Sequence, residues 1–284
     1  MQGTQQKEML VVKASGEVEP FSEAKLRRSL ERVKASPTII EGIVAHVRQE
    51  FINYSKTRDI YRHAFSLLRK HERPAAARYS LKRAIMELGP TGHPFENLVG
   101  ELLKLQGFSV EVAGIVQGLC VSHEVDVVAE QGSRHIMVEC KFHNEQGIKS
   151  DVKVALYVQA RFEDIQKAGG QKDPAHTQKF HEAWLVTNTQ LTSDAIAYAS
   201  CVGMKAIGWN YPAQGSLQDL IEQAGLHPLT CLTTLSGSNK RVLLDKGLVL
   251  CKDVAKNKKA LQAIGFNQPK IAQVEKEITQ LCGI

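Results

Sequence analysis

The chain of 284 residues lacks the segments that mark exported, membrane-spanning and disulfide-bonded proteins. It has no long apolar run and no signal or transit peptide, so we expect neither a membrane span nor export. Its six cysteines form no CxxC pair, which argues against a cysteine zinc site and against a disulfide framework. Low-complexity segments and convincing internal repeats are missing too. These absences favour a cytoplasmic protein whose cysteines stay reduced.

Charge is spread unevenly along the chain, which has a net charge of +6. Residues 1–90 hold 17 Lys and Arg against 10 Asp and Glu, residues 91–212 hold 10 against 14, and residues 213–284 hold 9 against 6. Turn-rich stretches at 88–94 and 209–216 separate these parts. We therefore predict three domains: an N-terminal (1–90), a central (91–212) and a C-terminal (213–284) module. The basic flanking modules favour a polyanionic partner, whereas the acidic centre can hold a divalent cation.

The most informative segment is HEVDVVAEQGSRHIMVECKFH, at residues 123–143. Its two apolar runs flank a turn-prone Gln-Gly-Ser, which predicts a β-hairpin. Because side chains alternate along a strand, Glu139 and Lys141 share one face, and Asp126 on the partner strand can face the same side. Two carboxylates and an ammonium group would then meet at one edge of an apolar sheet. Such oxygen ligands suit Mg²⁺ or Mn²⁺, and the arrangement suits phosphodiester hydrolysis.

Four segments of the central module resemble the Mrr-like branch of the PD-(D/E)xK nuclease superfamily, which also includes archaeal-type Holliday junction resolvases. In order, they are PFENLVGELLKLQGF, HEVDVV, VECKFH and AWLVTNTQLTSDAIAYASCVGMKAIGW. The resemblance implies a restriction-endonuclease-like α/β fold with a mixed sheet, and a metal-dependent DNA nuclease. It also implies that Asp126 and Glu139 bind the metal ion and that Lys141 is the catalytic lysine.

The same family uses a glutamate on the helix that opens the fold, and this chain offers Glu96 and Glu101 there. Helical spacing puts the apolar residues of this helix on one buried face: Phe95, Leu98, Val99, Leu102 and Leu103. Glu96 flanks this stripe, whereas Glu101 points further toward solvent. Glu96 is therefore our candidate for a fourth catalytic residue, although the helix dipole alone also favours a glutamate in the first turn.

The N-terminal module begins with a short hairpin pattern at residues 10–19, followed by four segments with helical spacing. We expect Ser22 to cap the first helix and Thr57 to cap the third. The motif VxKxxG, the Pro-Phe and Lys-Leu pairs at 20–21 and 25–26, and the TRDIY helix start together resemble the ATP-cone. That domain is a small α+β regulatory unit found on ribonucleotide reductases and some transcriptional repressors.

The resemblance to the ATP-cone implies that ATP or dATP binds to the N-terminal module. It assigns Lys13 on the hairpin and Lys25 on the first helix to phosphate contacts, and it places Glu19, Ser22 and Thr57 at further pocket positions. Lysines act as mobile point charges for a triphosphate, and a helix N-terminus adds positive potential. A cone that kept its fold and lost its nucleotide is the alternative.

The C-terminal module shows apolar residues at helical spacing, which predicts four or five short helices. Its stretch LQAIGFNQPKIAQVEKEI resembles a helix-hairpin-helix, with an apolar-Gly-apolar turn at residues 264–266 and Lys270 on the second helix. Backbone N–H groups at such a turn can bind a phosphate without reading bases. A packing or dimerisation bundle explains the same pattern, so both interpretations stay open.

Together these patterns predict a metal-dependent DNA endonuclease that ATP or dATP regulates through the N-terminal module. The expected partners are DNA and a purine nucleoside triphosphate, with no membrane, and a homo-oligomer is expected only by analogy with related nucleases. Two alternatives remain. One is a nucleotide-sensing DNA-binding regulator that keeps the nuclease fold as a scaffold, and the other is a nuclease of branched DNA.

Overall fold

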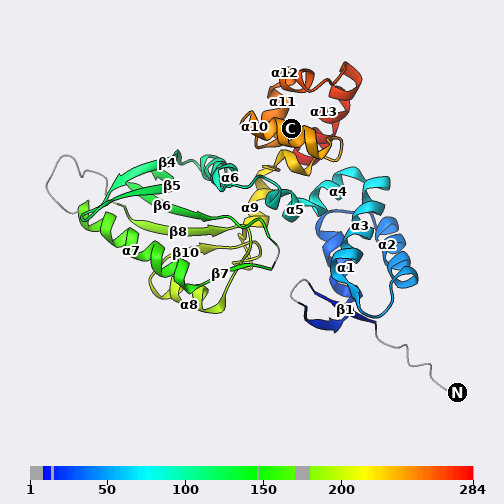
Figure 1. The fold of residues 1–284 in the computed structure, drawn as a ribbon, viewed down its shortest axis with the longest axis horizontal. Helices are drawn as coiled ribbons and strands as arrows, with labels where there is room; N and C mark the ends of the chain where they lie inside the picture. Colours follow the sequence, from blue (N-terminus) through cyan, green and yellow to red (C-terminus); the bar gives the residue numbers. More distant parts are fainter. Residues whose placement is uncertain (1–8, 14–15, 146, 170–179, 284) are drawn as a thin grey trace.

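Three groups of elements follow one another along the chain in the computed structural model, which describes residues 9–13, 16–145, 147–169 and 180–283. A small sheet with helices comes first, a larger sheet flanked by helices second, and a cluster of short helices last. Figure 1 shows the first group and the large sheet on opposite sides, with α5 (Leu81–Met86) and α9 (Leu217–Ala224) between them. The predicted α/β class with a mixed sheet is confirmed.

The N-terminal module is built on a three-stranded sheet with the order β2-β1-β3. Strand β1 (Leu10–Val12) pairs antiparallel with β2 (Val18–Pro20), as the hairpin pattern predicts, and parallel with β3 (Ser55–Lys56), which the sequence did not reveal. The helices that follow β2 and β3 are α1 (Glu23–Arg32), α2 (Pro37–Glu50), α3 (Thr57–His71) and α4 (Arg73–Tyr79).

The two expected helix caps of this module differ in outcome. Ser22 caps α1, because its hydroxyl accepts a hydrogen bond from the backbone N–H of Lys25 at 3.2 Å. Thr57 is instead the first helical residue of α3, and Lys56 occupies the cap position without a side-chain hydrogen bond. The expectation for Thr57 was wrong by one residue because β3 runs directly into the helix and leaves no separate capping turn.

The large sheet of the central module has the order β10-β8-β6-β5-β4. Its strands are β4 (Ser109–Gln117), β5 (Ser122–Gln131), β6 (Arg134–Lys141), β8 (Glu182–Thr187) and β10 (Lys205–Ile207). Strands β6, β8 and β10 run parallel, whereas β4, β5 and β6 are antiparallel neighbours. The predicted hairpin is β5–β6, and Gly132 in its tight turn has the left-handed φ of +60° that glycine adopts without strain. A separate short pair joins β7 (Lys149–Ser150) to β9 (Gln190–Leu191).

Helices cover both faces of the large sheet. On one side lies α6 (His93–Leu105), whose predicted apolar stripe is buried. On the other lie α7 (Val152–Ala168) and α8 (Ser193–Cys201). Alternation along β6 divides the core accordingly, because Val138 packs into the cluster that contains α6 whereas Met137 packs with Phe162 and Ile165 of α7.

Short helices make up the C-terminal module, as its spacing predicts. After α9 and a 3₁₀ turn (Leu229–Cys231) come α10 (Gly237–Asp245), α11 (Cys251–Lys256), α12 (Lys258–Ala263) and α13 (Gln268–Cys282). The apolar-Gly-apolar turn joins α12 to α13, with Gly265 at a φ of +85°. Apolar side chains of this module form one continuous cluster with α5 and α6, so the core runs across both predicted domain boundaries. The exact boundaries therefore stay predictions. No helix within the described ranges is both long and apolar enough to span a bilayer.

Candidate active site

The hairpin register places Asp126 and Glu139 on neighbouring strands at the same level. The paired positions end at Val127 opposite Val138, so Asp126 and Glu139 come next on the two strands. Residues directly across an antiparallel pair share one face of the sheet. The backbone N–H of Cys140 donates a 2.7 Å hydrogen bond to Oδ2 of Asp126, which fixes the Asp126 carboxylate beside the end of β6.

Arg161, on the helix α7 that covers one face of the sheet, forms an ion pair with the second carboxylate, that of Glu139. Its Nη1 donates to Oε2 of Glu139, and its Nη2 donates to the backbone oxygen of Glu124. The guanidinium carbon lies 5.2 Å from the centre of the Tyr157 ring, and Arg161 is only 8% exposed. Sequence reasoning missed this residue, because Arg161 lies 22 positions after Glu139 and belongs to no motif around the hairpin.

Each of the two carboxylates is anchored through one oxygen only. Among the described residues, no hydrogen bond reaches Oδ1 of Asp126 or Oε1 of Glu139. Burial raises the pKa of Asp126 above its ordinary value, partly offset by the Cys140 N–H. Burial also raises the pKa of Glu139, and the charge of Asp126 raises it further. A bound cation would therefore lower the free energy of ionising the two neighbouring carboxylates.

The structure separates the two candidate glutamates of α6. Burial and then the charge of Asp126 raise the pKa of Glu96, whose Oε2 lies 3.3 Å from Nδ1 of His93. Glu101 forms ion pairs with Lys104, at 2.8 Å, and with Lys252 of α11, and these hydrogen bonds keep its pKa low despite burial. Glu96 thus belongs to the electrostatic environment of Asp126, whereas Glu101 faces the C-terminal module.

Lys141 occupies the exposed end of β6, two residues beyond Glu139. Its positive charge favours the ionised forms of Asp126 and Glu139. Burial lowers the pKa of His143, and the charge of Lys141 lowers it further. The Nε2 atom of His143 lies 3.1 Å from Oγ of Ser150, so the chain after β6 is tied to β7. His143 is a further residue near the site that sequence reasoning did not select.

These residues fit a hard divalent cation. All the donors are carboxylate oxygens, which Mg²⁺ and Mn²⁺ prefer, and Asp126 and Glu139 each keep one oxygen available. Within the described part of the chain, no three of these carboxylates bring ligand atoms within 4.8 Å of one another. The site therefore suits an ion held by two protein carboxylates that keeps several of its waters, as Mg²⁺ commonly does.

Three of the candidate nucleotide residues contact one another in the N-terminal module. Nζ of Lys13 lies 2.7 Å from Oε2 of Glu19, and Nζ of Lys25 lies 3.5 Å from Oε1 of the same carboxylate. Hydrogen bonding to Lys13 lowers the pKa of Glu19, and the same contact raises the pKa of Lys13. Ser22 lies at the start of α1, and Thr57 directly follows β3, the parallel neighbour of β1. The five predicted residues thus lie on the strands and helix starts around one small sheet.

Comparison with known families agrees with this arrangement. Residues 9–87 match the ATP cone domain, residues 89–207 match the restriction endonuclease family that the Mrr proteins typify, and residues 227–282 match the family described as AF1548-like, C-terminal. An uncharacterized protein of Archaeoglobus fulgidus is 38% identical over 189 residues, which are 65% of this chain and 100% of the relative. This chain belongs to the AF1548-like family.

A solved structure supports the same assignment. The crystal structure of a protein of unknown function, AF1548, matches with a TM-score of 0.54 and 36% identity, over 68% of this chain and 99% of that one. The names of both relatives assign them no function. The AF1548-like chain described here therefore consists of an ATP-cone, a restriction-endonuclease-like domain and an AF1548-like C-terminal domain in sequence.

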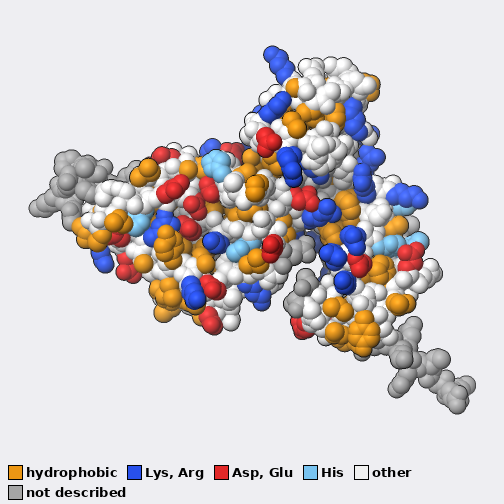
Figure 2. Space-filling view, viewed as in Figure 1, with side chains coloured by type: hydrophobic (Ala, Val, Ile, Leu, Met, Phe, Trp, Pro, Cys, Tyr) orange, Lys and Arg blue, Asp and Glu red, His pale blue; other side chains and the backbone are white. Residues whose placement is uncertain are grey.

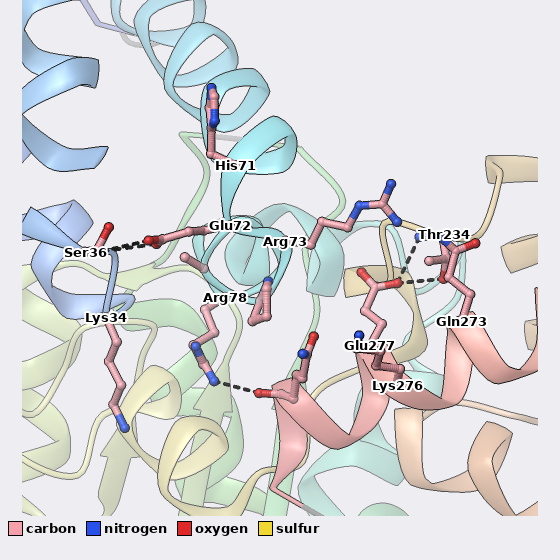
Figure 3. A pocket seen from close by; sticks show the side chains of 13 residues that line it. Lys34, Ser36, His71, Glu72, Arg73, Arg78, Thr234, Gln273, Lys276 and Glu277 are labelled. Atoms are coloured by element: carbon pink, nitrogen blue, oxygen red, sulfur yellow. Dashed lines mark hydrogen bonds between the residues drawn. The ribbon is translucent and has the colours of Figure 1, made fainter. Parts of the chain in front are cut away.

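The ATP-cone of this AF1548-like chain meets the C-terminal helices around a cationic cavity of about 630 Å³ (Figure 3). Arg78 of α4 donates a 2.9 Å hydrogen bond to the backbone oxygen of Gln280 in α13. Buried Glu277 accepts hydrogen bonds from Thr233 and Thr234, and Glu72 accepts them from the backbone of Ser36. Figure 2 shows Lys and Arg side chains gathered where these two parts meet. The cationic side chains that line the cavity are Lys34, Arg73, Arg78 and Lys276.

A second contact joins the cone to the helix that follows the large sheet. Arg32, the last residue of α1, lies 2.5 Å from Oδ1 of Asp219 and 3.8 Å from Oε2 of Glu222, both on α9. Asp219 also completes the capping box of α9 with Ser216. Helix α1 thus carries a candidate phosphate ligand, Lys25, at one end and a contact to α9 at the other.

Proposed function

We propose that this chain is a divalent-metal-dependent DNA endonuclease whose cutting is controlled by a purine nucleoside triphosphate bound to the ATP-cone. The observation that carries the proposal is the pair of neighbouring, half-buried carboxylates of Asp126 and Glu139, each with one oxygen that no described residue binds by a hydrogen bond. Two half-buried carboxylates side by side are costly to charge, and Arg161 forms an ion pair with only one of them, so a bound cation would lower that cost.

Each residue of the site has a distinct part in the proposed reaction. Asp126 and Glu139 would hold Mg²⁺ or Mn²⁺, which when bound polarises the phosphodiester and lowers the pKa of a water. Arg161 binds Oε2 of Glu139 and would leave the other oxygen of this carboxylate for the metal ion. Lys141, exposed at the end of β6, offsets negative charge that develops on the phosphate. Glu96, whose raised pKa reflects the nearby Asp126, would orient a water or a second ion.

DNA is the proposed substrate because the flanking parts of the chain are basic. The N-terminal and C-terminal modules carry an excess of Lys and Arg, whereas the central module has an excess of Asp and Glu. Phosphates would therefore be attracted by the flanks and presented to the acidic centre. The α12–α13 turn with Lys270 is a candidate phosphate contact, since Lys270 lies in the first turn of α13 and its side chain is only partly buried.

Nucleotide control would act through helix α1. A triphosphate bound by Lys13 and Lys25 would displace Glu19, which both lysines now contact. Helix α1 begins beside this contact and ends at Arg32, which pairs with Asp219. A change in the angle of α1 would therefore alter the position of α9 beside the nuclease core. Such control requires that nucleotide binding and DNA binding or cutting share a coupling free energy.

The direct experiment is incubation of supercoiled plasmid with the full chain and Mg²⁺ or Mn²⁺, with and without ATP or dATP. Nicked or linear product that needs the metal and disappears in chelator supports the nuclease, and a change in rate with nucleotide supports the control. DNA binding without any cutting in either metal would instead favour a nucleotide-sensing DNA-binding regulator. Preferential cutting of four-way junctions would favour a nuclease of branched DNA.

A further inference from the structure

The ATP-cone contains a cluster of metal-binding side chains that is separate from both sites described above. His46 and Glu50 lie one turn apart near the end of α2, and His63 lies on α3, the helix that packs against it. Residues four apart on a helix share one face, and both His46 and Glu50 lie close to His63, so this face meets α3. Figure 1 shows α2 at the edge of the cone away from the large sheet, with α3 beside it.

The spacing of the three side chains is that of ligands around one ion. Nδ1 of His46 lies 3.7 Å from Oε1 of Glu50, Nδ1 of His63 lies 3.5 Å from Oε2 of Glu50, and one ligand atom from each residue lies within 4.8 Å of the others. These distances are long for hydrogen bonds. Ligands bound tetrahedrally at about 2.0–2.1 Å from an ion are separated by roughly 3.4 Å. The three groups therefore surround a space of the size that a metal ion fills.

Packing fixes the His63 ring beside Glu50. The His63 side chain is 21% exposed and packs edge-on against Phe51, with ring centres 5.5 Å apart. Its Nε2 is buried and has no hydrogen-bond partner within the described residues. With the ring proton on this nitrogen, the lone pair of Nδ1 faces Glu50 and is available to a metal ion.

The donor set selects the kind of ion. Two imidazole nitrogens and one carboxylate suit zinc and its neighbours in the transition series, whereas Mg²⁺ and Ca²⁺ prefer oxygen ligands throughout. Three protein ligands leave a fourth position for water or another ligand. His46 and Glu50 are about half exposed, at 52% and 54% of their side chains, so that position opens to solvent. We propose that His46, Glu50 and His63 bind one zinc-class ion with an open fourth coordination position.

The ion would stabilise the part of the cone that is proposed to bind the nucleotide. The segment between α2 and α3 contains β3, which pairs with β1, and it leads directly into Thr57. A cation that links the end of α2 to α3 would restrict this segment from both sides. This structural consequence is independent of whether the central module cuts DNA.

Metal-stripped full-length protein titrated with Co²⁺ tests the proposal. We expect one equivalent of Co²⁺ to give the visible absorption of a four-coordinate site, without sulfur charge-transfer bands, and Zn²⁺ to displace it. The titration is run in an Asp126→Asn background, so that the carboxylate site in the sheet does not contribute. Zn²⁺ should also raise the melting temperature of the same protein.

Matched variants separate the cluster from adventitious binding. His46→Ala and Glu50→Gln change exposed side chains and should abolish the Co²⁺ spectrum while leaving the melting temperature of the metal-free protein unchanged. His71→Ala, at the exposed end of α3 and outside the cluster, should keep the spectrum. Absence of a four-coordinate spectrum in the parent protein, or its persistence in His46→Ala, would overturn the proposal.

Discussion

The buried ion pair between Arg161 and Glu139 gives the sharpest test of how the candidate site is held together. Replacing Arg161 with Met removes the charge but keeps most of the side-chain volume. It leaves Glu139, whose side chain is only 16% exposed, without its main cationic partner. The Glu124 backbone oxygen also loses a donor. We expect a clear loss of unfolding free energy at pH 7 in the absence of divalent metal.

The size of that loss has an upper limit set by protonation. A stranded carboxylate can always take up a proton, and at pH 7 this costs about 3.7 kcal/mol for a group with an ordinary pKa near 4.3. The pKa of Glu139 is already raised in the intact protein, so part of that cost is present before the substitution. With roughly 1 kcal/mol for the hydrogen bond to Glu124, we expect Arg161→Met to cost about 2–4 kcal/mol.

A double-mutant cycle measured by urea unfolding isolates the interaction. In the double variant Arg161→Met/Glu139→Gln the stranded charge is gone, so the loss should be smaller than the sum of the two single losses by at least about 1 kcal/mol. The control cycle uses Arg134 and Glu182, an exposed pair on the same sheet, which should couple by less than about 1 kcal/mol. Additive losses in the Arg161 cycle would refute the view that Arg161 neutralises Glu139.

Three other outcomes concern pH, nucleotide and coupling. Burial raises the pKa of Asp126 and Glu139, and only the ionised carboxylates bind a cation. As the pH is lowered, metal-dependent cutting should therefore be lost at a higher pH than it would be with carboxylates of ordinary pKa, which a pH–rate profile measures. Lys25→Glu should abolish the stabilisation by ATP or dATP, which amounts to about 2.7 kcal/mol at a nucleotide concentration 100 times Kd. Arg32→Ala should keep nucleotide binding, measured by calorimetry, but weaken the effect of nucleotide on cutting.

Each of these outcomes has its own control. The contribution of Asp126 and Glu139 to the stability of the fold should change in the opposite direction to cutting, since a carboxylate whose folded pKa is raised stabilises the fold as pH falls toward that pKa. A pH–rate profile in which cutting is lost only at about pH 4 or below would contradict the raised pKa values of Asp126 and Glu139. Arg28→Glu, an exposed change on the same helix as Lys25, should leave nucleotide stabilisation largely intact. Equal control of cutting in Arg32→Ala and the parent protein would rule out the route through α1.

The β5–β6 hairpin could be predicted from the sequence because it depends on interactions between residues that are close along the chain. Alternation of apolar residues and a two-residue turn determine the register, and the register alone brings Asp126 and Glu139 to one face. The buried stripe of α6 was predictable for the same reason. Strand β3 could not be predicted from two residues, because its pairing with β1 depends on contacts some 44 positions apart.

Long-range partners account for most of what the sequence did not show. Arg161 reaches Glu139 from a different helix, and Lys252 engages Glu101 from the C-terminal module. The choice between Glu96 and Glu101 rested on exposure alone, whereas the structure adds the ion pairs that occupy Glu101. The histidine cluster was equally hidden, because His63 joins His46 only when α2 and α3 pack together.

Plasmid cleavage by the parent protein and by Asp126→Asn tests the central claim most directly. An asparagine at this position can still accept the Cys140 N–H, and it removes a buried charge, so the variant should be at least as stable as the parent at pH 7. We predict metal-dependent cutting by the parent and none above background by the equally folded variant, with DNA binding retained. Undiminished cutting by Asp126→Asn would contradict the assignment of the active site to the β5–β6 hairpin.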